Sequence, residues 1–107
     1  MNLDQDRVPA SVEEALRLLG SGLTKREREA WTGMTAAQMF KLQYELARTL
    51  RWEWSLDDAN TPLRLFFREL GLDYAEEVSL LLIDAYWRMH NNEPKPIHEL
   101  VAEYLED

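Results

Sequence analysis

Helix-start signals recur at six places along this chain, and they constrain its fold more than any other feature. In the first three, a serine or threonine stands three residues before a glutamate or glutamine, which is the spacing of a capping box. The two side chains of a box bind backbone amides that the first helical turn leaves unpaired. The six signals are Ser11 with Glu14, Thr24 with Glu27, Thr35 with Gln38, Thr61 with Pro62, Asp73 with Glu76, and Pro96 with Glu99.

Helix-stop signals follow at matching distances. Glycines occur after the first, second and fourth expected helices, and an asparagine pair occurs after the fifth. Together the signals predict helices over residues 12–20, 25–31, 36–53, 62–70, 74–90 and 97–105. No stretch alternates apolar and polar residues for long enough to indicate a strand. We therefore expect an all-α fold, a single compact bundle of five to six helices.

The segment 74–90 is apolar on most of its sides, which is typical of a helix in the middle of a bundle. One of its faces holds Tyr74, Val78, Leu81, Leu82, Ala85, Tyr86 and Met89, and another holds Leu80, Ile83 and Trp87. Helix 36–53 has an apolar stripe of Met39, Leu42, Leu46, Leu50 and the following Trp54, widened by Phe40, Tyr44 and Ala47. We expect these two helices to pack against each other and the others to surround them.

At 107 residues the chain has the length of one domain. We expect residues 1–8 to form a flexible N-terminal arm, residues 9–107 a single helical domain, and residues 91–96 a flexible linker. There is no cysteine, which excludes disulfides, thiolate zinc sites and a cysteine nucleophile. The absence of cysteine, of a signal peptide and of a long apolar run leads us to expect a cytoplasmic protein that does not contact membranes.

The net charge is −8, and it is concentrated near the end of the chain. Residues 72–107 hold two basic and nine acidic side chains, a balance of −7. Such a field repels phosphate, so we expect no direct binding to nucleic acid. It would attract a protein partner with a basic surface, with Glu99 and Glu103 as candidate contacts. The alternative is that the acidic residues only keep the protein soluble.

A second candidate surface combines large aromatic rings with arginines between residues 48 and 68. Tryptophan and arginine are enriched at binding hot spots, and a guanidinium group can stack on an indole ring. The candidates for partner binding here are Trp52, Arg48, Arg64 and Arg68. The alternative is structural: Arg51 would bind carbonyl or carboxylate oxygens of the loop 57–60. The structural polar candidates are Arg51, Asp57, Asn60 and Ser79.

Motifs for catalysis, metal ions and cofactors are missing from the sequence. The loop 57–60 lacks the glycine and the final glutamate of an EF-hand, and His90 and His98 have no zinc-site spacing. There is no G-x-S-x-G turn around Ser79 and no glycine-rich phosphate loop. We therefore predict no catalytic residue, metal or cofactor. An enzyme that uses Asp57, Asp58 or His90 for acid–base chemistry is the least favoured alternative.

Several short motifs in succession resemble an uncharacterised family of small bacterial proteins, a domain of unknown function. They are Pro9, Ser11-Val12-Glu13-Glu14-Ala15, Tyr44, Leu50-Arg51, Asn60-Thr61-x-Leu63, Glu76-Glu77-Val78-Ser79 and Ala85-Tyr86-Trp87. The chain departs from the family pattern at Trp52, where asparagine is usual, and at Leu56-Asp57, where leucine-tryptophan is usual. The resemblance implies a helical domain in a bacterial or phage setting, and it implies no activity.

Three classes of function remain. The first is a small acidic interaction module that binds and blocks a protein partner, as inhibitors and immunity proteins do. Mimicry of a nucleic acid is one version of it. The second is a structural or regulatory homo-oligomeric subunit, such as a homodimer that buries Trp52 and the arginines. The third is an enzyme. Size, charge and the lack of catalytic motifs favour the first.

Overall fold

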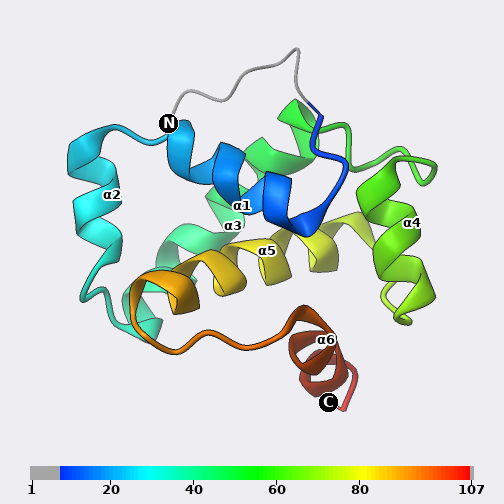
Figure 1. Cartoon of the computed structure of the whole chain (residues 1–107). Helices are drawn as coiled ribbons and strands as arrows, with labels where there is room; N and C mark the ends of the chain where they lie inside the picture. The colour runs from blue at the N-terminus through cyan, green and yellow to red at the C-terminus, as the bar shows by residue number, and fades with distance from the viewer. Residues whose placement is uncertain (1–7, 107) are drawn as a thin grey trace.

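A computed structural model describes residues 8–106, and these residues form six α-helices and no strand (Figure 1). The helices are α1 (Val12–Ser21), α2 (Lys25–Trp31), α3 (Ala36–Glu53), α4 (Pro62–Glu69), α5 (Ala75–His90) and α6 (Ile97–Leu105). The all-α prediction is confirmed, and each helix boundary lies within one residue of the predicted one. The predicted flexible arm, residues 1–8, lies outside the described residues except for Val8.

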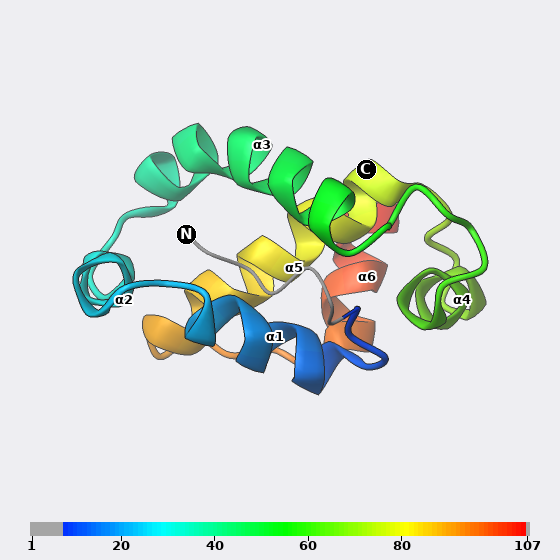
Figure 2. The same ribbon diagram turned by 90° about the horizontal axis from the view of Figure 1, so that it is seen from above.

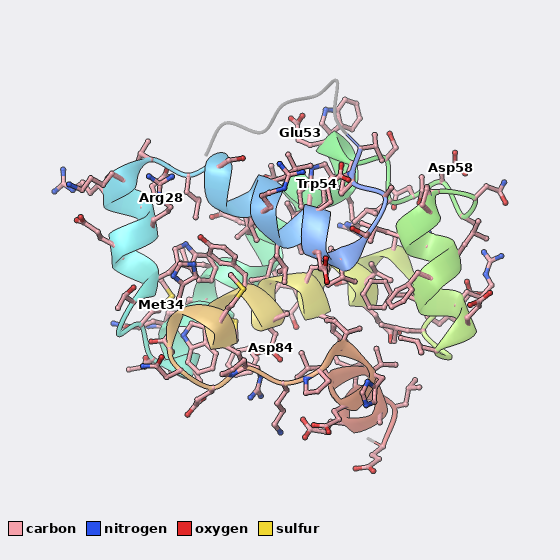
Figure 3. The ribbon with its side chains drawn as sticks, in the orientation of Figure 1. Arg28, Met34, Glu53, Trp54, Asp58 and Asp84 are labelled. Carbon is pink, nitrogen blue, oxygen red and sulfur yellow. The ribbon has the colours of Figure 1, made fainter. Side chains whose placement is uncertain are left out.

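The predicted central position of α5 is also confirmed. Helices α1, α3, α4 and α6 all pack against it, and nine of its sixteen residues are buried. Seen from above, α3 and α1 flank α5 on opposite sides, with α2 and α4 at the two ends (Figure 2). Met34 and Asp58 mark these opposite ends of the molecule (Figure 3). The radius of gyration, 13.0 Å, is that of a compact domain of this length.

The predicted contact between α3 and α5 is confirmed, but the buried line on α3 differs from the predicted one. The line consists of Met39, Gln43, Ala47, Leu50 and the C-cap residue Trp54. Phe40, Leu42 and Tyr44, which we expected in the core, are exposed. The spacing of four, four, three and four follows the helical repeat, and residues beside this line turn away from α5. The polar Gln43 is tolerated inside because its side-chain amide donates to the carbonyl oxygen of Leu80 at 3.0 Å.

The two ends of α5 correct the prediction in a similar way. Tyr74 and Met89 were expected on the apolar face, but both are exposed, Tyr74 to 69%. Tyr74 is the N-cap residue, with extended backbone, and it precedes the first turn of α5. The core of α5 therefore extends only from Val78 to Trp87.

Of the three predicted capping boxes, two form completely and the one at Ser11 forms only in part. The boxes of Thr24 with Glu27 and of Thr35 with Gln38 are complete, and the Ser11 hydroxyl accepts from the amide of Glu14. The predicted cap at Asp73 is wrong, because its carboxylate accepts a 2.9 Å hydrogen bond from Arg68 instead. Thr61 is an N-cap residue by position, but its hydroxyl donates to the carbonyl oxygen of Asp58.

The start of the linker 91–96 is anchored by Asn91, which sequence analysis placed in a flexible segment. Its side-chain nitrogen Nδ2 donates to the backbone carbonyl oxygens of Trp31 and Trp87. Its side-chain oxygen Oδ1 accepts from the backbone amide of Gly33. The indole of Trp87 donates to the carbonyl oxygen of Met34 at 2.7 Å. These bonds attach the turn between α2 and α3 to the C-terminal end of α5.

Candidate protein-binding groove

A groove with aromatic walls runs between α3 and α6, and α5 forms its floor. The floor is apolar, with Leu80 and Leu81 from α5 and Leu100 from α6. This hollow has a volume of about 300 Å³. It continues into a second hollow of about 630 Å³, which reaches the first turn of α5 and shares Tyr44, Leu80 and Tyr104 with the first.

Three aromatic side chains form the walls of the groove. Phe40 and Tyr44 lie one turn apart on α3 and are 57% and 63% exposed, and Tyr104 on α6 is 38% exposed. Aromatic rings held on rigid helices offer a large contact area at little cost in conformational entropy. These positions are typical of a binding surface more than of a solvated helix face.

The charged side chains that line the groove are all acidic. Glu76 and Glu77 lie where the groove reaches the first turn of α5, and Glu103 lies on α6. Asp84 lies on the side of α5 that faces α6 (Figure 3). No lysine or arginine of residues 8–106 lines either hollow. The groove therefore presents rings and carboxylates together, which is the combination that attracts a cationic side chain.

Two of the four carboxylates already have a basic neighbour. Oδ1 of Asp84 lies 3.3 Å from Nε of Arg88, one turn further along α5. Glu103 accepts a hydrogen bond from Lys95. This bond lowers the pKa of Glu103 below its usual value of 4.5. Glu76 and Glu77 form no ion pair with any residue that the structure describes. The acidic end of the groove is thus the part where charge is least compensated.

The arginine and tryptophan candidates separate into two groups in the structure. Trp52 is 79% exposed and Arg48 is exposed, both on the outer side of α3. Arg64 is buried, and it donates to the carbonyl oxygens of Leu56 at 2.6 Å and Asp73 at 3.0 Å. It is therefore occupied inside the domain and is not placed to bind a partner.

Arg68 and Arg51 also differ from their predicted roles. Arg68 binds the Asp73 carboxylate and donates to the carbonyl oxygen of Ala59, so it closes the loop before α4. We expected the Arg51 side chain to bind this loop, but it is half-buried and forms no hydrogen bond with the described residues. Arg64 and Arg68 hold the loop instead, because α4 starts directly after it and turns their side chains back over it.

The remaining candidates are distributed over the surface and the core. Asp57 is exposed, and Asn60 is exposed with its backbone amide bound to the Asp58 carboxylate at 2.9 Å. Ser79 is fully buried and donates to the carbonyl oxygen of Glu76, as a small residue at a helix contact can. Glu99 is exposed and lines neither hollow, whereas Glu103 lines the groove.

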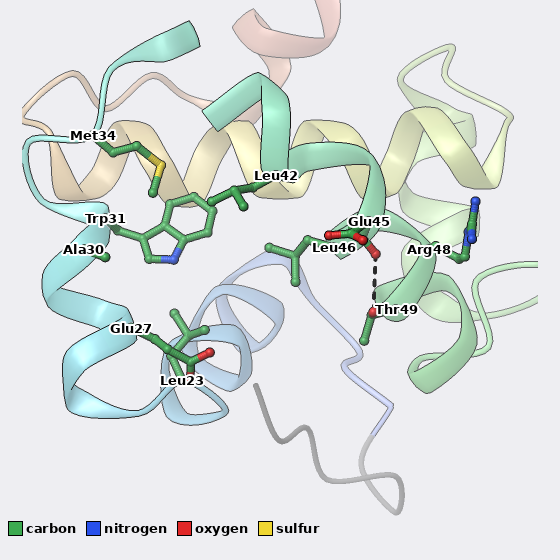
Figure 4. Close-up of a pocket in the computed structure, with 10 residues that line it drawn as sticks. All are labelled: Leu23, Glu27, Ala30, Trp31, Met34, Leu42, Glu45, Leu46, Arg48 and Thr49. Carbon is green, nitrogen blue, oxygen red and sulfur yellow. Dashed lines mark hydrogen bonds between the residues drawn. The ribbon is translucent and has the colours of Figure 1, made fainter. Parts of the chain in front are cut away.

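Two further hollows lie on α3. One, of about 480 Å³, surrounds Trp52 and includes Asp57 and Asp58, whose carboxylates are exposed. The other, of about 500 Å³, lies between α2 and α3 over Trp31 and Leu46, with Glu45 and Arg48 at its α3 edge (Figure 4).

The aromatic groove was not predicted from the sequence, because we expected Phe40 and Tyr44 in the core. One signal could have found them. A helix buried on one side has an apolar stripe of limited width, and Phe40 and Tyr44 together with Leu42 and Leu46 extend over too much of the circumference to be buried by one neighbour. Surplus aromatic residues beside such a stripe are therefore expected to be exposed.

A family model described as a domain of unknown function (DUF6794) matches residues 8–90. The match ends with the last residue of α5, so α6 and its side of the groove lie beyond it. No curated protein and no solved structure matches the chain. Among residues 8–106 there is also no helix with the length and hydropathy needed to cross a bilayer.

Proposed function

The chain belongs to this family, the domain of unknown function DUF6794, and from that premise we propose that it is a small acidic protein-interaction module. It binds a protein partner through the groove between α3 and α6 and blocks the surface that it covers, as inhibitors and immunity proteins do. The observation that carries the proposal is one groove that combines three exposed aromatic rings with four carboxylates and that no lysine or arginine of the described residues lines.

The chemistry of the groove selects a partner with lysine or arginine side chains. A cation over the rings of Tyr44 and Tyr104 gains about 0.5–2 kcal/mol from each ring, depending on how far it is desolvated. Glu76 and Glu77 attract the same cation over a longer range and increase the rate of encounter. The apolar floor at Leu80 then accepts the aliphatic part of that side chain.

Mimicry of a nucleic acid is one form of this function. The carboxylates would then occupy the phosphate sites of a nucleic-acid-binding protein. Binding would weaken steeply as salt concentration rises, and duplex DNA or RNA would compete for the partner.

The proposal is tested by affinity capture from the source cells on the immobilised chain, with three variants in parallel. We expect a basic protein to be retained by the parent chain and lost on Tyr44→Ser/Tyr104→Ser, with affinity lowered about tenfold or more. Tyr74→Ser is the matched control, because Tyr74 is an exposed tyrosine that lines neither hollow. Glu76→Gln/Glu77→Gln should slow association and reduce the dependence on salt.

Three results would contradict the proposal. One is equal retention of the same protein by the parent chain and by the double tyrosine variant, which would place the contact elsewhere. Another is a retained partner that is acidic. Its binding would become stronger at low salt only for the Glu76→Gln/Glu77→Gln variant, and not for the parent chain. Loss of capture by all variants including Tyr74→Ser would also contradict it, since the groove would then have no special role.

A further inference from the structure

The outer ridge of α3 consists of Lys41, Glu45, Arg48 and Trp52, at spacings of four, three and four. These spacings bring the four side chains onto one line along the helix, on the side opposite to the buried line that includes Gln43, Ala47 and Leu50. All four are exposed. Seen from above, α3 forms one edge of the molecule, and no other helix covers its outer side (Figure 2).

The charged groups of the outer ridge are not compensated within the domain. Lys41, Glu45 and Arg48 form no ion pair with the residues that the structure describes. Glu45 and Arg48 are three residues apart and could pair along the helix, yet they do not. Trp52 is 79% exposed, an unusual state for the largest apolar side chain.

Two copies of the outer ridge are complementary to each other when they run in opposite directions. If a second α3 is laid antiparallel across it, with a two-fold axis between residues 46 and 47, position 45 faces 48 and position 41 faces 52. Glu45 then meets Arg48 of the second copy, and Lys41 meets Trp52 of the second copy. Each contact occurs twice, because the interface is related by the two-fold axis.

We propose that the chain forms a homodimer through this ridge, with the two α3 helices antiparallel. The dimer holds two interchain ion pairs of Glu45 with Arg48 and two cation–π contacts of Lys41 with Trp52. Because the same patch is used on both copies, association stops at two chains and does not continue into a filament. The inference is independent of the proposed function, since none of the four ridge residues lines the groove between α3 and α6.

The size of the ridge sets the strength of the dimer. The helix is 18 residues long, which gives it a length of about 27 Å. A contact along one helix of this length lies at the lower end of the range for specific interfaces, which is about 1,200 Å² of total buried surface. We therefore expect dissociation in the micromolar range, with burial of Trp52 as the main apolar contribution.

The test is the molecular mass by sedimentation equilibrium from low to high micromolar concentrations. The mass of the parent protein should rise from that of one chain towards that of two as its concentration increases. Glu45→Arg alone and Arg48→Glu alone should each remain single chains, because like charges then face each other across the axis. Trp52→Ala should weaken the dimer about tenfold. Tyr74→Ala, an exposed aromatic off the ridge, should leave it unchanged.

Charge reversal also tests the orientation. The double variant Glu45→Arg/Arg48→Glu should dimerise again, and an equimolar mixture of the two single variants should form heterodimers in which every ion pair is restored. A parent chain that stays single at all concentrations would overturn the proposal. A dimer that survives both single charge reversals, or that the double variant does not restore, would overturn it as well.

Discussion

The side-chain amide of Gln43 donates a 3.0 Å hydrogen bond to the backbone carbonyl oxygen of Leu80, inside the contact between α3 and α5. Gln43 is only 7% exposed and stands in a line of otherwise apolar residues. The bond fixes how α3 lies along α5, and it therefore sets the position of Phe40 and Tyr44, which flank Gln43 on the wall of the groove.

Replacement of Gln43 tests this bond. Gln43→Met keeps the volume and removes the donor, and we expect the free energy of unfolding to fall by about 1 kcal/mol, the net value of one neutral hydrogen bond. Gln43→Glu should cost more, about 2–3 kcal/mol at neutral pH, because a buried carboxylate would face a carbonyl oxygen. Urea unfolding followed by circular dichroism measures both. Equal stability of the glutamate variant and the parent would contradict the buried contact.

Arg64 is the second polar group on which the fold depends. Its guanidinium group binds the carbonyl oxygens of Leu56 and Asp73 while buried, so it connects the loop before α4 to the residues after it. We expect Arg64→Met to lower the free energy of unfolding by about 3 kcal/mol, because two carbonyl oxygens lose their donors. Arg51→Met is the matched control and should cost less than half as much, since the Arg51 side chain donates no hydrogen bond to the described residues. Equal losses of unfolding free energy in the two variants would show that the arginines act by packing alone.

The comparison of these two arginines shows what could be predicted from the sequence. Each helix is marked locally, by caps such as Thr24 with Glu27 and by apolar spacing, so the six helices and the central place of α5 were predictable. Which arginine reaches the loop depends on how α4 turns relative to α3, and this is set by tertiary packing. The sequence indicates that an arginine binds the loop, but only the structure identifies Arg64 and Arg68 as the arginines that do so.

The groove was less predictable for the same reason. Apolar spacing predicts that Phe40 and Tyr44 lie near the buried line of α3, and they do lie beside it. Whether a neighbour covers them depends on the position of α6, which packs against α5 and leaves a hollow next to α3. Local sequence patterns contain no information on the distance between α3 and α6. The acidic side was partly predicted, since Glu103 lines the groove and Glu99 does not.

The ion pair of Asp73 with Arg68 makes stability depend on pH. The hydrogen bond from Arg68 lowers the pKa of Asp73 below its usual 3.8, so this carboxylate contributes stability above that pH and loses it as the pH falls through the folded value. We expect Asp73→Asn to be less stable than the parent at pH 7, with the difference shrinking as the pH falls below about 4. Asp57→Asn, an exposed loop carboxylate without an ion pair among the described residues, should show no such trend. Urea unfolding at a series of pH values measures the difference, and a gap that widens in acid would contradict the ion pair.

The hydroxyl of Tyr86 is buried against Gly20 and has no hydrogen-bond partner among the described residues. A Cβ atom on Gly20 would lie 3.4 Å from that oxygen, so α1 approaches α5 closely at this point. Burial raises the pKa of the phenol and leaves its polar group without the hydrogen bonds that water would provide. We therefore expect Tyr86→Phe to keep or increase the free energy of unfolding, by up to about 1 kcal/mol, whereas most core substitutions lower it.

Tyr86→Leu is the control. It also removes the hydroxyl, but it loses the edge-on contact with Trp31, whose ring centroid lies 5.2 Å from that of Tyr86, and it should be destabilising. Thermal unfolding of the three proteins separates the two effects, and a loss of more than about 1 kcal/mol in the phenylalanine variant would mean that the hydroxyl is hydrogen-bonded in solution.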